Sequence, residues 1–285
     1  GGGYRGGGRG LMVGIDKYSF GALGGGVAGA DALTAFLERG DDGSINFDVR
    51  KLTDPPQPIT RAALRQALTE LFSQPAEVAL FYFSGHGTEN NLGGYLVTPD
   101  ARAYDEGVAM TDVITLANRG VVSETVIIVD CCHSGHLGTV SVGPRDANVR
   151  AELSEGVSIL TASRSTEPAM EAGGRGIFTT LLCSALDGGA ADVLGEVKIA
   201  ATYSYIDESL GSWQQRPLFK SHVSSLLSLR QCAPSITPVR LRRIANLFPS
   251  PDHKFQLDPS YERTHAAADI AKVDVYDILA AYRNA

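Results

Sequence analysis

Long apolar runs and an excess of positive charge are both missing from this sequence of 285 residues. No apolar stretch approaches the roughly 18 residues that a membrane-spanning helix needs, and no signal peptide is evident. We therefore expect no membrane partner. The net charge is −7, with 25 Lys and Arg against 32 Asp and Glu. Nucleic-acid binding usually needs a basic face, so this charge disfavours a nucleic-acid partner.

Cysteine is also scarce: four are present, at positions 131, 132, 183 and 232, and two of them are adjacent. Adjacent cysteines make a poor disulfide framework, which indicates a reducing compartment and predicts a cytoplasmic protein. Hydrophobic residues make up 44% and charged residues 20%, values typical of a globular protein with a core. The length suits one sizeable α/β domain with an appendage, or two small domains.

Three stretches of different character follow one another along the chain. Residues 1–10 (GGGYRGGGRG) are of low complexity and predict a flexible Gly-rich lead. Residues 11–233 alternate apolar runs with stretches of helical spacing and predict a folded domain. Residues 234–285 are Pro-rich and irregular before a short terminal helix. We interpret them as an accessory C-terminal segment of unknown role.

The folded domain has the pattern of an α/β protein. Its main apolar runs predict buried strands at 11–15, 78–85, 125–130 and 157–162. Its helical spacing predicts helices over 28–39, 61–72, 111–120, 176–187 and 199–211, with Thr60 and Thr111 as N-caps of the second and third. Continuously apolar strands that alternate with helices predict a mainly parallel sheet covered by helices on both faces.

Two of the strands end in polar motifs, SGHG (84–87) and DCCHSG (130–135). Active residues in parallel sheets lie beyond the carboxyl ends of the strands, so the two motifs are expected to meet. A cysteine hydrolase needs a thiolate, a nearby imidazole and donors for an oxyanion. We assign these roles to Cys132 as nucleophile, His86 as general base and the backbone amides of Gly87 and Cys132 as oxyanion donors.

These motifs resemble the F-S-G-H-G and D-x-C-H-S-G pair of metacaspases and bacterial orthocaspases, cysteine peptidases of the caspase type in clan CD (peptidase C14). The 46-residue separation of His86 and Cys132 is close to that of caspases. The resemblance covers residues 11–222 and implies a caspase-like three-layer α/β/α sandwich with a large half at about 11–140 and a small half at about 155–233. In that alignment Cys131 is the x position, which predicts an inert buried residue.

Substrate preference is predicted from acidic residues near the nucleophile. Asp130 stands where caspases carry Gln and where metacaspases, which prefer Arg or Lys at P1, carry Asp. A carboxylate pairs well with a guanidinium, and bidentate geometry favours Arg over Lys. GGGVAGADAL (24–33) resembles the G-C-x-N-D-A stretch of metacaspases, which implies Asp31 as a second S1 acid. A charge near a helix N-terminus is the alternative role of Asp31, and Asp16 is a reserve candidate for the pocket.

Further pocket and processing residues follow from the same resemblance. Ser163 is expected to line the S1 wall through its backbone, and Glu171 is a further candidate pocket acid. The turn-rich stretch 136–156 lies where caspase-type enzymes are cleaved between their halves. It holds Arg145 and Arg150, so we hypothesise a zymogen that is cleaved there by itself or by a related protease. Protein or peptide substrates and an activating protease or upstream effector are the expected partners.

No cofactor or metal is assigned from the sequence. Calcium activates several metacaspases, so calcium dependence stays an open question for this chain. The acidic residues between the two motifs do not have the spacing of an EF-hand loop. They are Asp100, Asp105, Glu106 and Asp112.

Three functions are compatible with these observations. The first is an Arg-directed endopeptidase, and the resemblance suggests a bacterial defence or cell-death pathway for it. The second is a catalytically silent caspase-fold adaptor, in which residues 234–285 recruit a partner and the pocket only recognises basic peptides. Intact His86 and Cys132 argue against it. The third is a separase-like protease or a transpeptidase of the same clan, with the same dyad but another trigger and target.

Overall fold

The computed structural model describes residues 7–90, 93–103, 105–132, 153–162, 171–172, 175–211, 217–222 and 227–285, with the backbone alone for residues 89, 90, 93, 132, 171, 172 and 175. Its main sheet has the strand order β11-β7-β6-β3-β1-β2, and β4 and β5 extend from β3. The strands of this sheet are β1 (Gly8–Ile15), β2 (Phe47–Asp54), β3 (Val78–Asn90), β4 (Gly93–Arg102), β5 (Asp105–Ala109), β6 (Glu124–Cys132), β7 (Val157–Thr161) and β11 (Leu218–His222).

Within the run β2-β1-β3-β6-β7 each strand is parallel to the next. Strand β11 runs antiparallel to β7, and β4 runs antiparallel to both β3 and β5. Two small antiparallel ladders complete the strands, β8 (Glu171–Ala172) with β9 (Arg175–Gly176) and β10 (Glu196–Lys198) with β12 (Ser228–Gln231). The main sheet is therefore mixed but mostly parallel, as the continuously apolar strand runs predict.

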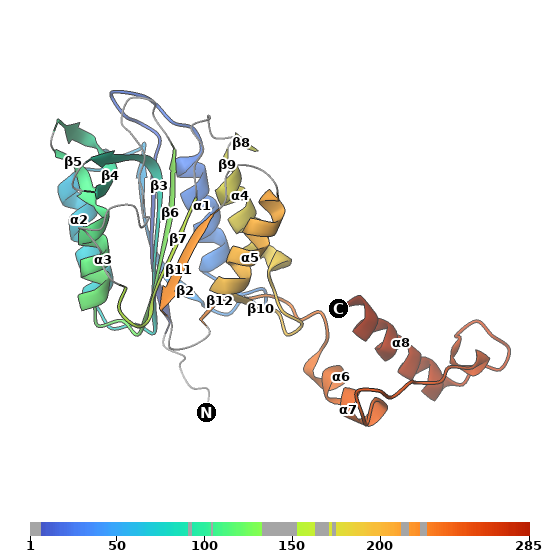
Figure 1. The fold of residues 1–285 in the computed structure, drawn as a ribbon. Coiled ribbons are helices and arrows are strands. Elements are labelled where there is room, and N and C mark those ends of the chain that lie inside the picture. The colour runs from blue at the N-terminus through green and yellow to red at the C-terminus, as the bar shows by residue number, and fades with distance from the viewer. Residues whose placement is uncertain are drawn as a thin grey trace.

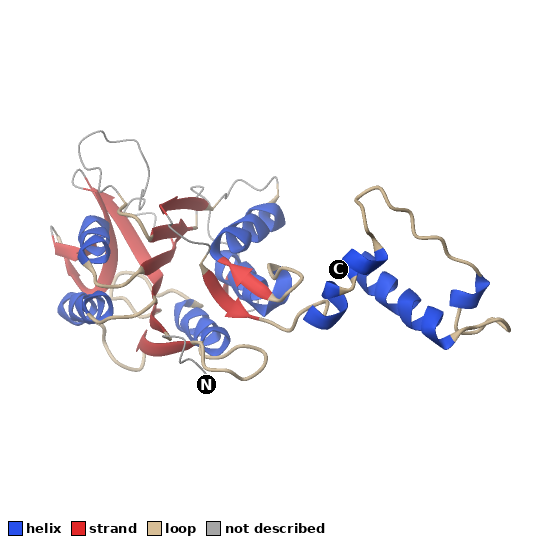
Figure 2. Ribbon diagram, turned by 90° about the horizontal axis from the view of Figure 1, so that it is seen from below, coloured by secondary structure: helices blue, strands red, loops and turns tan. Residues whose placement is uncertain are grey.

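Helices cover both faces of the sheet (Figures 1 and 2). One face carries α1 (Gly26–Leu37), α4 (Ile177–Ser184) with the π-helical turn η1 (Ala185–Gly189), and α5 (Ile199–Leu210). The other face carries α2 (Arg61–Ser73) and α3 (Met110–Arg119). The prediction of a three-layer α/β/α sandwich around a mainly parallel sheet is confirmed.

The starts of α2 and α3 differ in how well the sequence predicts them. The Thr60 hydroxyl accepts a hydrogen bond from the Ala63 amide at 3.1 Å, so Thr60 caps α2 as expected. The predicted cap at Thr111 is wrong, because Ala109 is the N-cap of α3 and Thr111 lies inside the helix. The chain passes directly from β5 into α3, and alanine has no side-chain group that could cap the helix.

The sheet separates two apolar cores, because successive strand residues point to opposite faces. Phe81, Phe83 and Val129 lie in the cluster on the α2–α3 side. Tyr82 and Ile128, their neighbours along β3 and β6, lie in the cluster on the α1–α4–α5 side. Burial on both faces explains why these strands are continuously apolar in sequence.

The Gly-rich lead is shorter than predicted. Strand β1 begins at Gly8 rather than Leu11, and Gly8 and Arg9 are already in register with Phe47 and Asp48 of β2. The Gly8 amide also donates to the Asn46 carbonyl at 3.1 Å. Backbone pairing with a neighbouring strand needs no side chain, so low-complexity glycine can still extend a strand.

Strand β3 also continues past the predicted end at residue 85. Up to His86 it pairs with β6, and from Gly87 it pairs with Leu96 and the rest of β4. The SGHG motif therefore lies where β3 exchanges one neighbour for another, and the β4–β5 hairpin that creates this exchange was not predicted.

Residues 238–285, which we call the C-terminal lobe, lie apart from the sandwich in both ribbon views (Figures 1 and 2). The lobe contains α6 (Pro238–Arg242), α7 (Ile244–Leu247), the 3-10 turn η2 (Pro259–Tyr261) and α8 (Ile270–Asn284), which is the predicted terminal helix. Ion pairs join its parts, from Arg243 to Asp274 at 2.9 Å and from Arg263 to Asp277 at 2.7 Å. Among the described residues, no helix is both long enough and apolar enough to cross a bilayer.

Candidate active site

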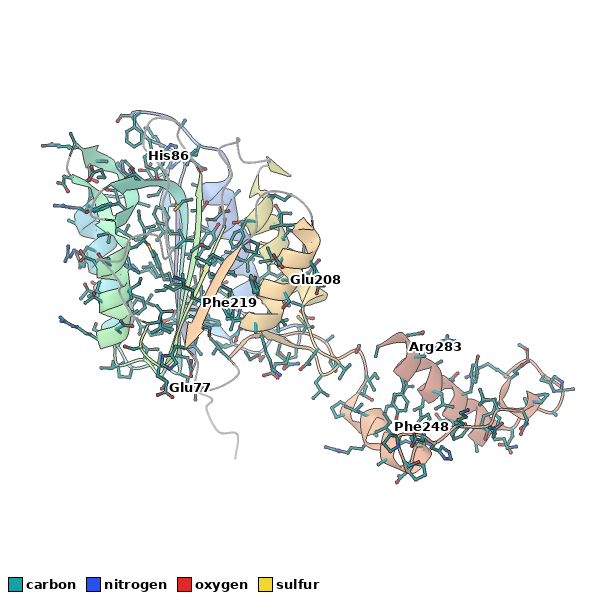
Figure 3. All side chains as sticks on the ribbon, in the orientation of Figure 1. Glu77, His86, Glu208, Phe219, Phe248 and Arg283 are labelled. Atoms are coloured by element: carbon teal, nitrogen blue, oxygen red, sulfur yellow. The ribbon has the colours of Figure 1, made fainter. Side chains whose placement is uncertain are left out.

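The register of two neighbouring parallel strands places the two motif residues side by side. In the β3–β6 ladder, Ser84 is opposite Asp130 and His86 is opposite Cys132, the last residue of β6. His86 lies at one end of the sheet and Glu77, which directly precedes β3, lies at the other (Figure 3). The sheet therefore brings together at its carboxyl edge two residues that are far apart in sequence.

The His86 imidazole is buried and its orientation is fixed by the loop after β1. Its side chain is 2% exposed, and its Nε2 lies 2.8 Å from the carbonyl oxygen of Gly21. A carbonyl can only accept, so Nε2 carries the proton and Nδ1 carries the lone pair. Nδ1 has no hydrogen-bond partner among the described residues. The arrangement leaves one imidazole nitrogen able to accept a proton.

Tyr18 contacts both the backbone and the ring of the same histidine. Its hydroxyl accepts the His86 backbone N–H at 3.0 Å and donates to the Val97 carbonyl at 3.1 Å. The Tyr18 and His86 rings lie 4.5 Å apart, centre to centre. Burial raises the pKa of Tyr18 far above its usual value, so the hydroxyl stays protonated. Gly85 permits this contact, since a Cβ there would lie 2.5 Å from the Tyr18 hydroxyl.

The other cysteines are all in the interior. Cys131 is 4% exposed and packs in the core on the α2–α3 side, as its x position in the motif predicts. Cys183 and Cys232 are buried in the opposite core. Burial also raises the pKa of the Cys232 thiol, which disfavours its thiolate.

Asp130 is held by a chain of hydroxyl groups on the α1–α4 side of the sheet. It is 7% exposed, and its Oδ2 accepts a hydrogen bond from the Thr179 hydroxyl of α4 at 2.6 Å. Thr179 has one proton and gives it to Asp130, so the Tyr82 hydroxyl at 2.8 Å must donate to Thr179. Burial and, next, the negative charge of Asp130 raise the pKa of Tyr82. Tyr82 therefore stays protonated and continues to donate its hydrogen bond to Thr179.

Two glycines let this polar group pack closely. A Cβ on Gly29 of α1 would lie 2.7 Å from the Tyr82 hydroxyl, and one on Gly176 would lie 3.1 Å from the Asp130 carboxylate. Gly176 is opposite Glu171 in the β8–β9 ladder. The backbone of Glu171, a candidate pocket acid, is thus next to the strand that approaches Asp130.

The structure does not bring Asp31 together with Asp130. Asp31 is exposed on α1 and forms an ion pair with Lys51 of β2. Gly29 faces Tyr82 and Thr179, and residues two apart in a helix are about 200° apart around its axis. Asp31 is therefore turned away from the Asp130 group, and it lies beyond the first turn of the helix.

Asp16 has a structural role in its observed position. Its carboxylate accepts the backbone N–H groups of Gly26 and Val27 at 2.7 and 3.2 Å, the first two amides of α1. These contacts satisfy donors that a helix start leaves without partners. Asp16 thereby fixes the start of α1 next to the end of β1.

Several other predicted residues cannot be placed. Ser163, Arg145 and Arg150 lie outside the described residues, as does most of the stretch 136–156. Gly87 is described and pairs with Leu96, and its role as an oxyanion donor stays a prediction.

The acidic residues considered for calcium mainly contact the arginines of α2. Asp100 accepts the Arg61 backbone N–H at 3.0 Å, Asp105 pairs with the Arg61 guanidinium, and Asp112 lies 3.1 Å from Arg65. Within the described part of the chain, no three His, Cys, Asp or Glu side chains gather as metal ligands would.

Sequence reasoning missed three residues that position the candidate site: Tyr18, the Gly21 carbonyl and Thr179. A carbonyl oxygen leaves no trace in a sequence, and a threonine in the apolar run GIFTTLL is equally uninformative. Tyr18 follows the first strand closely, which was a usable signal, because loops after strands reach the carboxyl edge of the sheet.

Comparison with solved structures identifies proteins with a similar fold. Protein GSU0716 from Geobacter sulfurreducens is 16% identical with a TM-score of 0.57, and the match covers 80% of this chain and 98% of that one. The structure of pro-sf-caspase-1 is 12% identical with a TM-score of 0.55, over 79% of this chain and 94% of that one. Identities this low show a shared fold alone.

The sequence itself gives a more specific result. No curated protein sequence matches the chain. The family model of the caspase domain, however, matches residues 8–227, which include β1, both motifs and the strands of the main sheet. By this match over most of its length, the chain belongs to the caspase domain family of cysteine peptidases.

Proposed function

We propose that the protein is a cysteine endopeptidase with Cys132 as nucleophile and His86 as general base. The observation that carries the proposal is the pairing of His86 with Cys132 on adjacent strands, together with a buried imidazole whose Nε2 is bound to Gly21. Family membership alone does not decide activity. His86 has an imidazole nitrogen that can accept a proton, and it is paired in the sheet with Cys132. This arrangement supports an active enzyme over a catalytically silent adaptor.

The proposed reaction follows from the tautomer of His86. Nδ1 takes the proton of the Cys132 thiol, and the thiolate attacks the carbonyl carbon of the scissile peptide bond. The imidazolium, held at Nε2 by Gly21, then gives its proton to the leaving amine. A water molecule hydrolyses the resulting thioester, with His86 again as base. The amides of Gly87 and Cys132 are the proposed donors to the oxyanion.

Asp130 is the residue proposed to give the enzyme its preference for a basic P1 residue, with Arg favoured over Lys. Positions 130 and 132 belong to the same face of β6, because successive strand residues alternate. The Thr179 hydroxyl occupies one side of the carboxylate and fixes its plane. A fixed carboxylate beside the nucleophile position suits the planar guanidinium of arginine, which binds carboxylates in a bidentate manner.

The test is hydrolysis of fluorogenic peptides that differ only in Arg, Lys or Asp at P1, with wild type, Cys132→Ala and Cys131→Ala compared. Cys131→Ala is the matched control, because it removes the neighbouring thiol from the apolar core. We expect Arg to be cleaved fastest, and kcat/KM to fall by about 10³-fold or more in Cys132→Ala. Cys131→Ala is expected to keep its activity per folded molecule.

The contrary outcomes separate the parts of the proposal. Faster cleavage after Asp would refute the role of Asp130 while leaving the nucleophile intact. Full activity of folded Cys132→Ala would refute the nucleophile. Absence of cleavage for all three peptides by the folded wild type, with and without calcium, would favour the adaptor.

A further inference from the structure

The chain leaves the sandwich at the end of the sheet opposite to His86. We call this end, where the parallel strands begin, the amino edge. Helix α1 starts beside Asp16 at the carboxyl edge and ends near the start of β2, where the Asn46 amide donates to Glu38. At this amino edge the Asp41 amide donates to the carbonyl of Gln231, the last residue of β12, and its carboxylate accepts the Ala233 amide at 2.8 Å. Figure 3 shows the same relation, with His86 at the end of the sandwich away from the C-terminal lobe.

Among the described residues, Ile236 forms the last hydrogen bond between the chain and the sandwich: it is buried, and its amide donates to the Val193 carbonyl. Helix α6 follows directly, and no side chain of α6 or α7 is buried. Arg240 and Arg242 are exposed on α6. Within the described part of the chain neither guanidinium forms an ion pair, whereas Arg243 next to them is paired with Asp274. Two arginines without an ion pair are thus exposed in residues 237–242, which join the sandwich to the lobe and which we call the junction.

The short helix that carries them is easily opened. It has five residues, and an isolated helix of that length is not stable in water. Local opening of an exposed element with few buried contacts needs little free energy. The junction can therefore become the extended chain that a protease binds.

The junction cannot reach the candidate dyad of its own molecule. The eight residue steps of β3 from Val78 to His86 span about 26 Å at ~3.3 Å per residue. The six steps from Ile236 to Arg242 span at most about 21 Å even when fully extended. Ile236 is held near the amino edge, so the chain from Ile236 to Arg242 is too short to reach His86 even along a straight line. A path around the sandwich would be longer still.

We propose that the C-terminal lobe is a substrate of this enzyme in trans: one copy cleaves a second copy after Arg240 or Arg242 and releases the lobe. This inference rests on the proposed function, and it names a substrate whose basic residues match the acid Asp130. Both arginines are exposed, and cleavage after either leaves every element of the sandwich intact.

The chemical step balances without any further reactant. The Cys132 sulfur forms a thioester with the carbonyl carbon of Arg240 or Arg242, and the peptide C–N bond breaks. The amine of Leu241 or Arg243 leaves with the proton carried by His86. Water then hydrolyses the thioester, which regenerates the thiol and leaves a sandwich with a new carboxyl terminus.

The experiment uses the 285-residue chain with the change Cys132→Ala as substrate, since it lacks the proposed nucleophile and stays whole during preparation. Catalytic amounts of wild type are added, product masses are measured, and an Arg-P1 peptide is assayed in the same samples. We expect a cut after residue 240 or 242 at a rate proportional to the wild-type concentration. The added changes Arg240→Gln and Arg242→Gln should slow it by about 100-fold or more, because a site built for a charged group rejects an uncharged one. Arg263→Gln, the matched control in the same lobe, should leave the rate unchanged.

Four results would overturn the inference. If the peptide is cleaved but the Cys132→Ala chain stays whole, the inference fails and the proposed function stands. If neither is cleaved, the proposed function fails as well. A first cut at Lys254 or Arg263 would refute the site. A conversion of wild type whose half-time is independent of protein concentration would show cleavage within one molecule and refute the trans mechanism.

Discussion

The two faces of the sheet bury their side chains in different ways. On the α2–α3 face the described core between β3, β6 and the helices is apolar, with Phe81, Phe83 and Val129 at its centre. On the α1–α4 face the core becomes polar toward the carboxyl edge, where Tyr82, Thr179 and Asp130 form a buried hydrogen-bonded chain.

With Asp130 as the proposed S1 acid, this difference predicts separate roles for the two faces, specificity for one and stability for the other. A buried carboxylate is tolerated only where hydrogen bonds satisfy it, and the hydroxyl chain provides them. The core that α2 and α3 form with β3 and β6 is apolar, so its side chains contribute by the area that they bury. Changes in the chain of Tyr82, Thr179 and Asp130 should alter substrate choice, while changes in the apolar core under α2 and α3, away from His86, should alter only the free energy of unfolding.

The largest effect is expected from Asp130→Asn. The change removes the negative charge while preserving shape, so a bound guanidinium loses its ionic partner. Loss of one partner of a buried charge pair costs about 2–5 kcal/mol, which predicts a fall in kcat/KM for Arg peptides of about 30- to 5,000-fold. Peptide hydrolysis measures it, with circular dichroism to confirm folding. An unchanged ratio of Arg to uncharged P1 cleavage would place the S1 acid elsewhere.

Thr179→Val should have an intermediate effect. Valine has nearly the same volume but removes the hydroxyl that Tyr82 and Asp130 share. We expect a loss of about 1–3 kcal/mol in the free energy of unfolding and a rise of roughly tenfold in KM for Arg peptides. Urea titration and steady-state kinetics measure the two.

The control for Thr179→Val is Leu68→Ala on α2, a fully buried residue of the apolar face. It should destabilise the fold by about 2–5 kcal/mol without changing the P1 preference of the folded fraction. If both variants lowered the preference for Arg equally, the division between the two faces would be wrong.

The smallest effect is expected from Tyr18→Phe. Tyr18 packs with the apolar face but reaches the His86 backbone, so it is the point where the two faces join. We expect kcat to fall by about tenfold or less with KM unchanged, since about 1 kcal/mol of hydrogen bonding that orients His86 is lost.

The pH dependence of the Tyr18→Phe effect gives a further test. The raised pKa of Tyr18 keeps its hydroxyl protonated in the folded state, and an unfolded tyrosine also stays protonated below about pH 10. The ratio of wild-type to Tyr18→Phe kcat should therefore be the same at about pH 6 and pH 9. A ratio that changes across this range would mean that Tyr18 titrates during the reaction.

The sequence by itself determined the layers and the two motif strands. Continuous apolar runs require burial on both faces, and the polar residues after them mark the carboxyl edge, so β3, β6 and the candidate pair His86 and Cys132 could be predicted. Asp130 followed from its place in the same motif. These inferences rest on local patterns and on one topological rule.

Tertiary structure alone decided the contacts around those residues. The Gly21 carbonyl, the Tyr18 hydroxyl and Thr179 act on groups that are 49 to 68 residues away, and no local pattern encodes such distances. Asp31 illustrates the same limit, because the resemblance implied a pocket role for it while its place on α1 pairs it with Lys51. Which neighbour a side chain meets depends on how whole elements pack, and that packing is a property of the folded chain.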